Sequence, residues 1–175
     1  MVTRSLARVL VVAALCVLVG LATACSRDTG EDTTARDVAV YRSVIADLVD
    51  RSVVELDDSQ GSPVLYVEGL GALIPLAVQV DVVAAFADDY EIRFIDDLAE
   101  AIEADEPHRP VRGDGLLVGL GPVVVDGGAT LRGEFYVREG DVAAFGYELS
   151  LQGDGTWAIV GDPEPIAPEG FVTDP

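Results

Sequence analysis

The sequence contains no lysine, one histidine and two cysteines, and each shortage excludes a class of site. The histidine, His108, stands between Pro107 and Arg109 in a segment expected to be an exposed loop. Hydrolysis through a histidine base needs a nucleophile and an orienting acid around it, and no Gly-x-Ser-x-Gly motif is present. A metal site would need further nitrogen or sulfur ligands. The sequence therefore predicts no catalytic residues, no metal centre and no cofactor.

Positive charge is also scarce. Eleven arginines stand against 31 acidic residues, which gives a formal net charge of −20. Nucleic acids and anionic lipid headgroups are bound through basic surfaces, so the composition excludes a nucleic-acid partner. A solvated acidic surface is the simplest interpretation of the charge, and it identifies neither a protein nor a small-molecule partner.

The first 24 residues have the three parts of a secretory signal. Arg4 and Arg8 form a positive start, residues 9–19 form an uninterrupted apolar run, and residues 22–24 are small. A membrane-spanning helix needs roughly 20 apolar residues, so this run is too short to favour a permanent span. A signal peptide over residues 1–24 that is removed on export is expected.

The residues Leu21-Ala22-Thr23-Ala24-Cys25 resemble the lipobox of bacterial lipoproteins. The resemblance implies cleavage between Ala24 and Cys25, a diacylglyceryl group on the Cys25 thiol and usually an acylated amino terminus. Each buried methylene contributes about 0.8 kcal/mol, so two or three chains make a stable tether. The expected location is the outward face of a cell membrane, with the bilayer as partner through the lipid on Cys25. Two alternatives remain, namely ordinary cleavage that releases a secreted product and an uncleaved signal anchor.

The mature chain that begins at Cys25 has no internal disulfide, because the other cysteine, Cys16, lies in the signal. Residues 25–35 are polar and lack apolar periodicity, which is typical of a flexible spacer. Residues 36–162 have the length and apolar content of a single folded domain. Residues 163–175 are rich in proline and glutamate and are expected to be an irregular tail.

Apolar periodicity predicts two helices in the first half of the domain, over about residues 34–54 and 76–88. Short buried strands are expected at residues 64–67 and 91–95, and a short acidic helix at residues 97–104. Helices and strands therefore alternate in this part of the chain, whereas the last third is predicted to contain strands.

The last third predicts an antiparallel meander of four strands, because strong turn signals separate its apolar runs. The two-residue period of a strand places Leu131 and Phe135 on an apolar face, with Arg132 and Glu134 on a polar face. A sheet with one apolar face needs a cover, which the helices supply. We therefore expect an α+β fold in which helices pack on one face of a mainly antiparallel sheet with a C-terminal four-strand meander.

Three features follow one another along the chain in a characteristic order. They are Tyr41 in the first helix, the strand at residues 64–67 and the segment Gly155-Thr156-Trp157. This order resembles uncharacterised secreted proteins of GC-rich bacteria. In these a helix headed by tyrosine precedes a strand and a Gly-x-Trp strand closes the chain. The resemblance implies no known activity.

The remaining motifs add no catalytic function. Gly69-Leu70-Gly71 lacks the third glycine of a dinucleotide-binding fingerprint. The two carboxylates of an acid–base pair must lie on either side of the substrate bond that is cleaved. Adjacent acids such as Asp88 and Asp89 cannot face one another in this way. The leading prediction is a non-enzymatic, lipid-anchored binding or accessory domain at the cell envelope.

Two other functions remain open. One is a small-molecule pocket, with or without catalysis, formed where the helices curl over the sheet, as in cystatin-like and nuclear-transport-factor-like folds. Tyr66, Glu68 and Tyr147 are the candidate pocket residues. The other is an acidic structural subunit of an envelope complex, whose partner would have a basic face.

Overall fold

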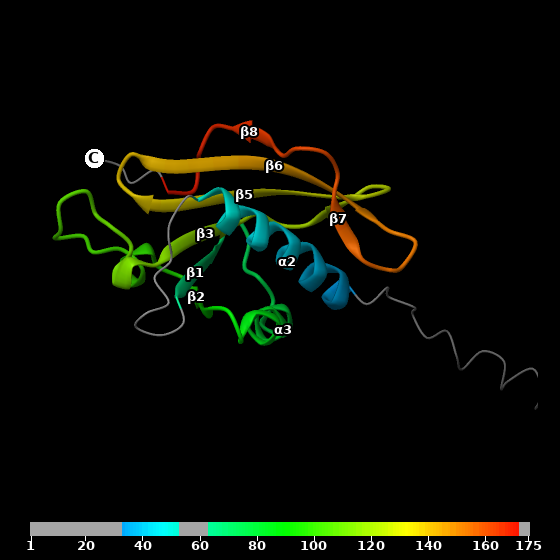
Figure 1. The fold of residues 1–175 in the computed structure, drawn as a ribbon, viewed down its shortest axis with the longest axis horizontal. Helices are drawn as coiled ribbons and strands as arrows, with labels where there is room; N and C mark the ends of the chain where they lie inside the picture. The colour runs from blue at the N-terminus through cyan, green and yellow to red at the C-terminus, as the bar shows by residue number, and fades with distance from the viewer. Residues whose placement is uncertain (1–32, 53–62, 172–175) are drawn as a thin grey trace, which may run out of the picture. The chain divides into compact units, whose positions relative to one another are not determined.

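The computed structural model describes residues 33–52 and 63–171, in which two α-helices accompany one eight-stranded sheet (Figure 1). The predicted α+β class is confirmed. The helices are α2 (Thr33–Arg51) and α3 (Leu76–Phe86), and the 3-10 turns are η1 (Leu98–Glu100) and η2 (Arg112–Asp114). The strands are β1 (Val64–Gly69), β2 (Glu91–Ile95), β3 (Leu116–Leu120), β4 (Val124–Val125), β5 (Ala129–Arg138), β6 (Asp141–Leu151), β7 (Trp157–Ile159) and β8 (Glu164–Ile166).

The sheet is mixed, with the strand order β2-β1-β3-β5-β6-β7, while β4 pairs with β5 and β8 pairs with β6. Strand β1 runs parallel to both β2 and β3, and the pairs β3/β5, β5/β6 and β6/β7 are antiparallel. Parallel neighbours require a crossover connection. Helix α3 is the crossover from β1 to β2, and residues 96–115 return the chain to β3.

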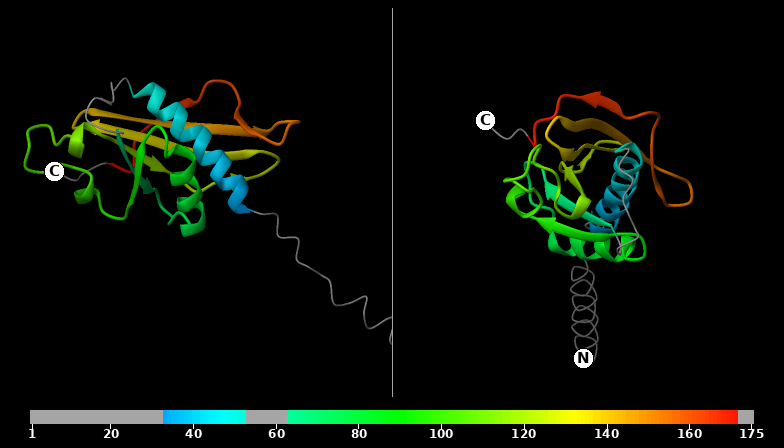
Figure 2. Two further views of the ribbon diagram at one scale, coloured as in Figure 1. Left: turned by 60° about the horizontal axis from the view of Figure 1, so that its bottom comes forward. Right: turned by 60° about the vertical axis from the view of Figure 1, so that its left-hand side comes forward.

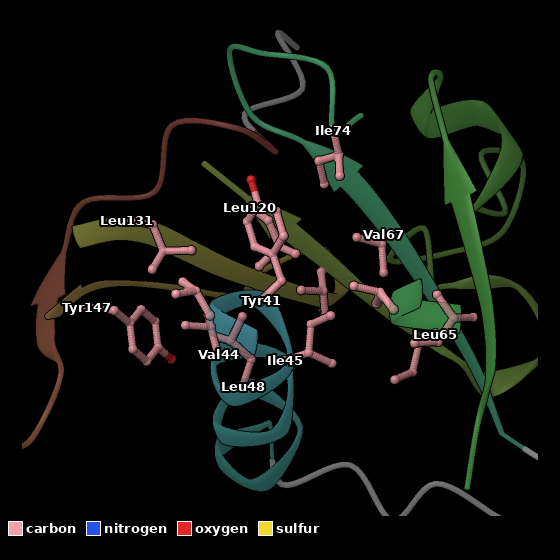
Figure 3. Close-up of a cluster of buried hydrophobic side chains, with 14 of the residues drawn as sticks. Tyr41, Val44, Ile45, Leu48, Leu65, Val67, Ile74, Leu120, Leu131 and Tyr147 are labelled. Atoms are coloured by element: carbon pink, nitrogen blue, oxygen red, sulfur yellow. The ribbon is translucent and has the colours of Figure 1, made fainter. Parts of the chain in front are cut away.

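Helices α2 and α3 cover one face of the sheet (Figures 1 and 2). Helix α2 buries Tyr41, Val44, Ile45 and Leu48 at the spacing of a single helix face, as the sequence predicts. Figure 3 shows these side chains pointing into a cluster with residues of β1, β3, β5 and β6. The hydroxyl of Tyr41 also donates to the carbonyl of Gly121 at 3.2 Å. The helix-facing side of the sheet is therefore the main core.

The other side of the sheet, here called the outer face, is covered by irregular chain. The side chains of Tyr66, Leu117 and Tyr136 form a second apolar cluster there with residues of segment 95–111 and with Phe171. The alternation predicted for β5 is observed, but its polar face is not solvated: Glu134 is 0 % exposed and Tyr136 4 %. The solvated face expected from the sequence is wrong at this point, because segments distant in the chain lie on it.

The segment after residue 162 is not an irregular tail over the described residues. Glu164–Ile166 forms β8, which pairs with Ala144–Gly146 of β6. Phe171 is 4 % exposed within the outer-face cluster. Proline does not prevent this pairing, because β8 is an edge strand and needs hydrogen bonds on one side alone. The last described residues therefore belong to the domain.

Within residues 33–52 and 63–171, neither helix combines the length and the apolar character that crossing a bilayer requires.

Candidate functional site: a carboxylate pocket on the outer face

Two glutamates and a glycine form one row across the outer face. Glu68 of β1 is in register with Gly119 of β3, and Gly119 is in register with Glu134 of β5. Neighbouring strands lie about 4.8 Å apart, so the two glutamate backbones are separated by about 10 Å. A side chain at position 119 would meet Leu70 and Phe171, since a Cβ there would lie 2.9 Å from both. Glycine thus lets these two side chains sit on the sheet between the carboxylates.

The carboxylate of Glu134 has a full set of partners. Its Oε1 accepts from the Arg132 guanidinium and from the amide of Glu169 at 3.2 Å. The amide of Gly170 donates to Oε2 at 3.1 Å. Glu134 therefore holds the C-terminal segment against the sheet, and its buried charge is compensated.

Arg132 completes this attachment. Besides Glu134, its guanidinium donates to the carbonyl of Ala167 and lies 3.5 Å from Oε2 of Glu169. The side chain of Arg132 is 21 % exposed and that of Glu134 is 0 % exposed. Hydrogen bonds between charged groups are stronger than neutral ones, so Arg132 and Glu134 together form a clamp on residues 167–170.

Glu68 stands in a different environment. Its Oε2 atom is buried and has no hydrogen-bond partner among the described residues. Burial raises the pKa of Glu68, and the negative charges of Asp97 and Glu134 raise it further. A buried polar atom without a partner costs free energy, which makes Glu68 the unsatisfied member of the row.

Glu68 lines two cavities. The larger, of about 330 Å³, lies between the end of β1, the start of the β3–β4 turn and the C-terminal segment. The smaller, of about 130 Å³, lies beside the start of α3 and the end of β2. The larger cavity is lined by Glu68, Gly69, Leu70, Gly71, Gly121, Pro122, Arg132, Glu134, Glu169 and Gly170. We call this larger cavity the Glu68 pocket.

A wider groove of about 660 Å³ adjoins the Glu68 pocket, since both are lined by Pro122 and Arg132. Glu148, Asp162 and Glu164 line this groove. The outer face therefore surrounds Arg132 with acidic groups.

The arrangement favours binding of positive charge. Arg132 is occupied by Glu134, Ala167 and Glu169, whereas one oxygen of Glu68 remains free to accept a hydrogen bond. An ammonium or guanidinium group in the Glu68 pocket would bring a donor and a positive charge close to the Glu68 carboxylate and favour its ionised form. Ligand pockets commonly combine apolar walls with a few polar groups, and Leu70 and Pro122 provide such walls here.

The structure brings two of the three predicted pocket residues to the same face. Tyr66 and Glu68 both lie on the outer face of β1, and the Tyr66 hydroxyl accepts a 3.4 Å hydrogen bond from Arg93. Tyr147 lies on the helix-facing side, where its hydroxyl donates to Oδ2 of Asp47 at 2.8 Å. Burial raises the pKa of Tyr147, and that hydrogen bond raises it further. Tyr147 is therefore apart from the Glu68 pocket.

Sequence reasoning missed Arg132 and Glu134 as parts of the site. It placed both on the polar face of their strand, which is correct, but nothing in the sequence marks residues 167–171 as their cover. His108 lies in an exposed loop, as expected. The proposed cleavage site at Ala24 and Cys25 and the lipidation site at Cys25 lie outside the described residues.

Among residues 33–52 and 63–171, no group of three histidine, cysteine, aspartate or glutamate side chains is placed to hold a metal ion. Comparison with known proteins gave no family model, no curated protein and no solved structure that matches this chain.

Proposed function

We propose that the protein is a lipid-anchored domain on the outward face of a bacterial cell membrane and that it binds a small organic cation in the Glu68 pocket. The observation that carries the binding proposal is Glu68 itself, which lines a cavity of about 330 Å³ and whose Oε2 is buried without a partner among the described residues. The lipobox-like residues ending at Cys25 carry the location.

The charge of the molecule supports a cationic ligand. Removal of residues 1–24 leaves nine arginines against 31 acids, a formal net charge of −22. A strongly negative protein raises the local concentration of cations near its surface. The ligand class is thus an amine or guanidine with a short apolar part that fits against Leu70 and Pro122.

A non-enzymatic role fits the pocket better than acid–base catalysis. Catalysis by two carboxylates requires both to reach the reacting bond. Glu134 is fully buried and already accepts from Arg132, Glu169 and Gly170, so a substrate would have to break these bonds to reach it. Glu68 alone provides a binding group without a catalytic partner.

The pocket proposed here differs from one between helices and sheet. Apolar side chains of α2, α3 and the sheet pack that space in one continuous cluster, whereas the Glu68 pocket opens on the outer face. An acidic structural subunit remains a second proposal, supported by the net charge alone.

The binding proposal is tested with n-butylammonium chloride as the probe and n-butanol as its neutral counterpart. A ligand that binds the folded state alone raises the unfolding temperature in proportion to its occupancy. We expect the ammonium salt to raise it more than butanol or an equal concentration of sodium chloride, and Glu68→Gln to abolish the difference. Glu148→Gln, which removes an exposed acid from the adjoining groove, is the matched control and should retain it. Equal responses of the two variants would reject the Glu68 pocket.

The anchor is tested by mass spectrometry of the mature amino terminus made in a lipoprotein-processing bacterium. A diacylglyceryl mass on Cys25 supports the proposal. Recovery of Cys25→Ala in the membrane fraction at the level of the original protein would contradict it.

A further inference from the structure

Helix α3 exposes a stripe of large apolar side chains. Leu76, Val80 and Val83 recur at helical spacing on one side, and Leu76 is 73 % and Val80 57 % exposed. Leu73, in the loop that leads into the helix, is 84 % exposed. We call these four residues the α3 stripe.

The stripe is unusual because the opposite side of the same helix is already buried in the core. That side contributes Val78, Val82 and Phe86 to the cluster beneath α2. Gln79 and Asp81 are the polar residues of α3. A helix that is apolar on all sides is normally covered on all sides, and a contiguous exposed apolar patch marks an interaction surface.

The start of α2 and helix α3 lie on the same side of the domain, the lower side in Figure 1 (Figures 1 and 2). Thr33, where α2 begins, stands eight positions after Cys25 in the sequence. A chain spans at most about 3.6 Å per residue, so α2 begins no farther than about 29 Å from the Cys25 backbone. If Cys25 carries the lipid, the α3 stripe is within reach of the bilayer surface.

We propose that the α3 stripe rests on the outer surface of the bilayer to which the chain is anchored, with its leucine and valine side chains inserted among the lipid headgroups. This inference rests on the lipid anchor of the proposed function. An amphipathic surface binds the membrane interface through its buried apolar area, and a short tether converts that binding into an intramolecular step.

Charge identifies the lipid surface that suits the stripe. Asp81 lies on the helix, and Asp88 and Asp89 follow its end, all of them exposed. No arginine or lysine lies between Leu73 and Asp89. Anionic headgroups repel such a surface, so a zwitterionic lipid surface is the expected partner.

The test uses the acylated mature chain in phosphatidylcholine vesicles. The Cys25 sulfur is bound to the diacylglyceryl group in that chain, so Leu76→Cys introduces the one free thiol for a nitrobenzoxadiazole label. We expect a blue-shifted emission and quenching by spin-labelled lipid. Asp105→Cys, at an exposed position of the loop between η1 and η2, is the matched control and should show neither.

A second variant separates insertion from simple proximity. Val80→Glu in the Leu76→Cys background adds a charge to an exposed position, so the unfolding temperature should change little. Lipid quenching should fall at least about tenfold, since a charge opposes insertion of the stripe.

The outcomes are distinguishable. Acyl chains on Cys25 without lipid quenching at position 76 would overturn this inference alone, whereas unacylated Cys25 would overturn the anchor as well. A blue shift that grows with protein density and is insensitive to spin-labelled lipid would assign the stripe to a second copy of the chain, which also overturns the inference. Equal quenching in vesicles with and without one third phosphatidylserine would overturn the preference for zwitterionic lipid.

Discussion

At the scale of single residues, Glu68 and Glu134 show how partners decide the state of a buried carboxylate. Both lie on the outer face in one row across the sheet. Glu134 accepts from a guanidinium and two amides, whereas Oε2 of Glu68 accepts from none of the described residues. Burial and the negative charges of Asp97 and Glu134 therefore disfavour the ionised form of Glu68 and raise its pKa.

Glu68→Gln should therefore stabilise the ligand-free protein at neutral pH. The folded-state pKa of Glu68 is raised above the unfolded value of about 4.3, so below that pH the acid is neutral in both states and costs nothing. As pH rises through the folded pKa, the folded state must hold a buried charge and loses stability. We expect the variant to exceed the original in unfolding free energy by on the order of 1 kcal/mol at pH 7 and to show little gain at pH 4. Urea unfolding at both pH values measures this difference, and a constant difference would contradict the argument.

Glu134→Ala should be strongly destabilising, by about 3 kcal/mol, because it leaves the Arg132 guanidinium and the part-buried amides of Glu169 and Gly170 without their acceptor. Glu169→Ala removes another acid near Arg132, but its side chain is 79 % exposed, so a loss below about 1 kcal/mol is expected. Urea unfolding at pH 7 compares the two. Similar losses of unfolding free energy in the two variants would contradict the argument that the buried acid contributes more to stability than the exposed one.

The two acids also show which part of the site could be predicted from the sequence. Alternation along β5 places Glu134 and Arg132 on the same face without reference to the rest of the chain. Their burial depends on Phe171 and on the amides of Glu169 and Gly170, which are more than 30 positions away in the sequence. Periodicity reports the direction of a side chain but not what covers it.

At the scale of elements, periodicity predicted the parts whose partners are near in the chain. Strand β2 matches the predicted residues 91–95, and α3 begins at the predicted Leu76 and ends at Phe86, two residues earlier than expected. Strand β8 was missed because a Pro-rich segment resembles a tail until β6 supplies its hydrogen bonds. Elements that exist through long-range pairing leave a weak local signal.

The C-terminal segment should open when its apolar contact is removed. The ring of Phe171 packs edge-on against Tyr136, with ring centroids 6.0 Å apart. We expect Phe171→Ala to cost about 2 to 3 kcal/mol and to accelerate hydrogen exchange of the Glu169 and Gly170 amides at least about tenfold. Val160→Ala, at a half-exposed position of the same C-terminal region, should leave both amides unchanged. Unaltered exchange in Phe171→Ala would mean that the Arg132–Glu134 clamp alone holds the segment.

At the scale of the whole molecule, charge opposes folding. The formal net charge of −20 makes the chain repel itself, and salt screens that repulsion over about 10 Å at 0.1 M. The interior has to offset this repulsion through apolar packing, because residues 33–52 and 63–171 contain no cysteine.

The unfolding temperature should therefore rise with salt. Between 10 and 150 mM sodium chloride at pH 7 we expect a gain of about 3 °C, corresponding to about 1 kcal/mol for a chain of this length. Near pH 4, close to the sequence pI of about 4.1, the same change should have little effect. Differential scanning calorimetry measures both, and an equal gain at the two pH values would assign the effect to something other than self-repulsion.

The attachment of residues 167–171 to the middle of the sheet also sets a limit on when the protein finishes folding. A chain still on the ribosome contains α2, β1 and β3 but lacks the amides of Glu169 and Gly170 and the ring of Phe171. Until these arrive, Glu134 and Gly119 lack this cover, and their part of the outer face stays open. Closure of that face thus depends on residues 167–171, and a variant without residues 167–175 should fail at this step while its helix-facing core still forms.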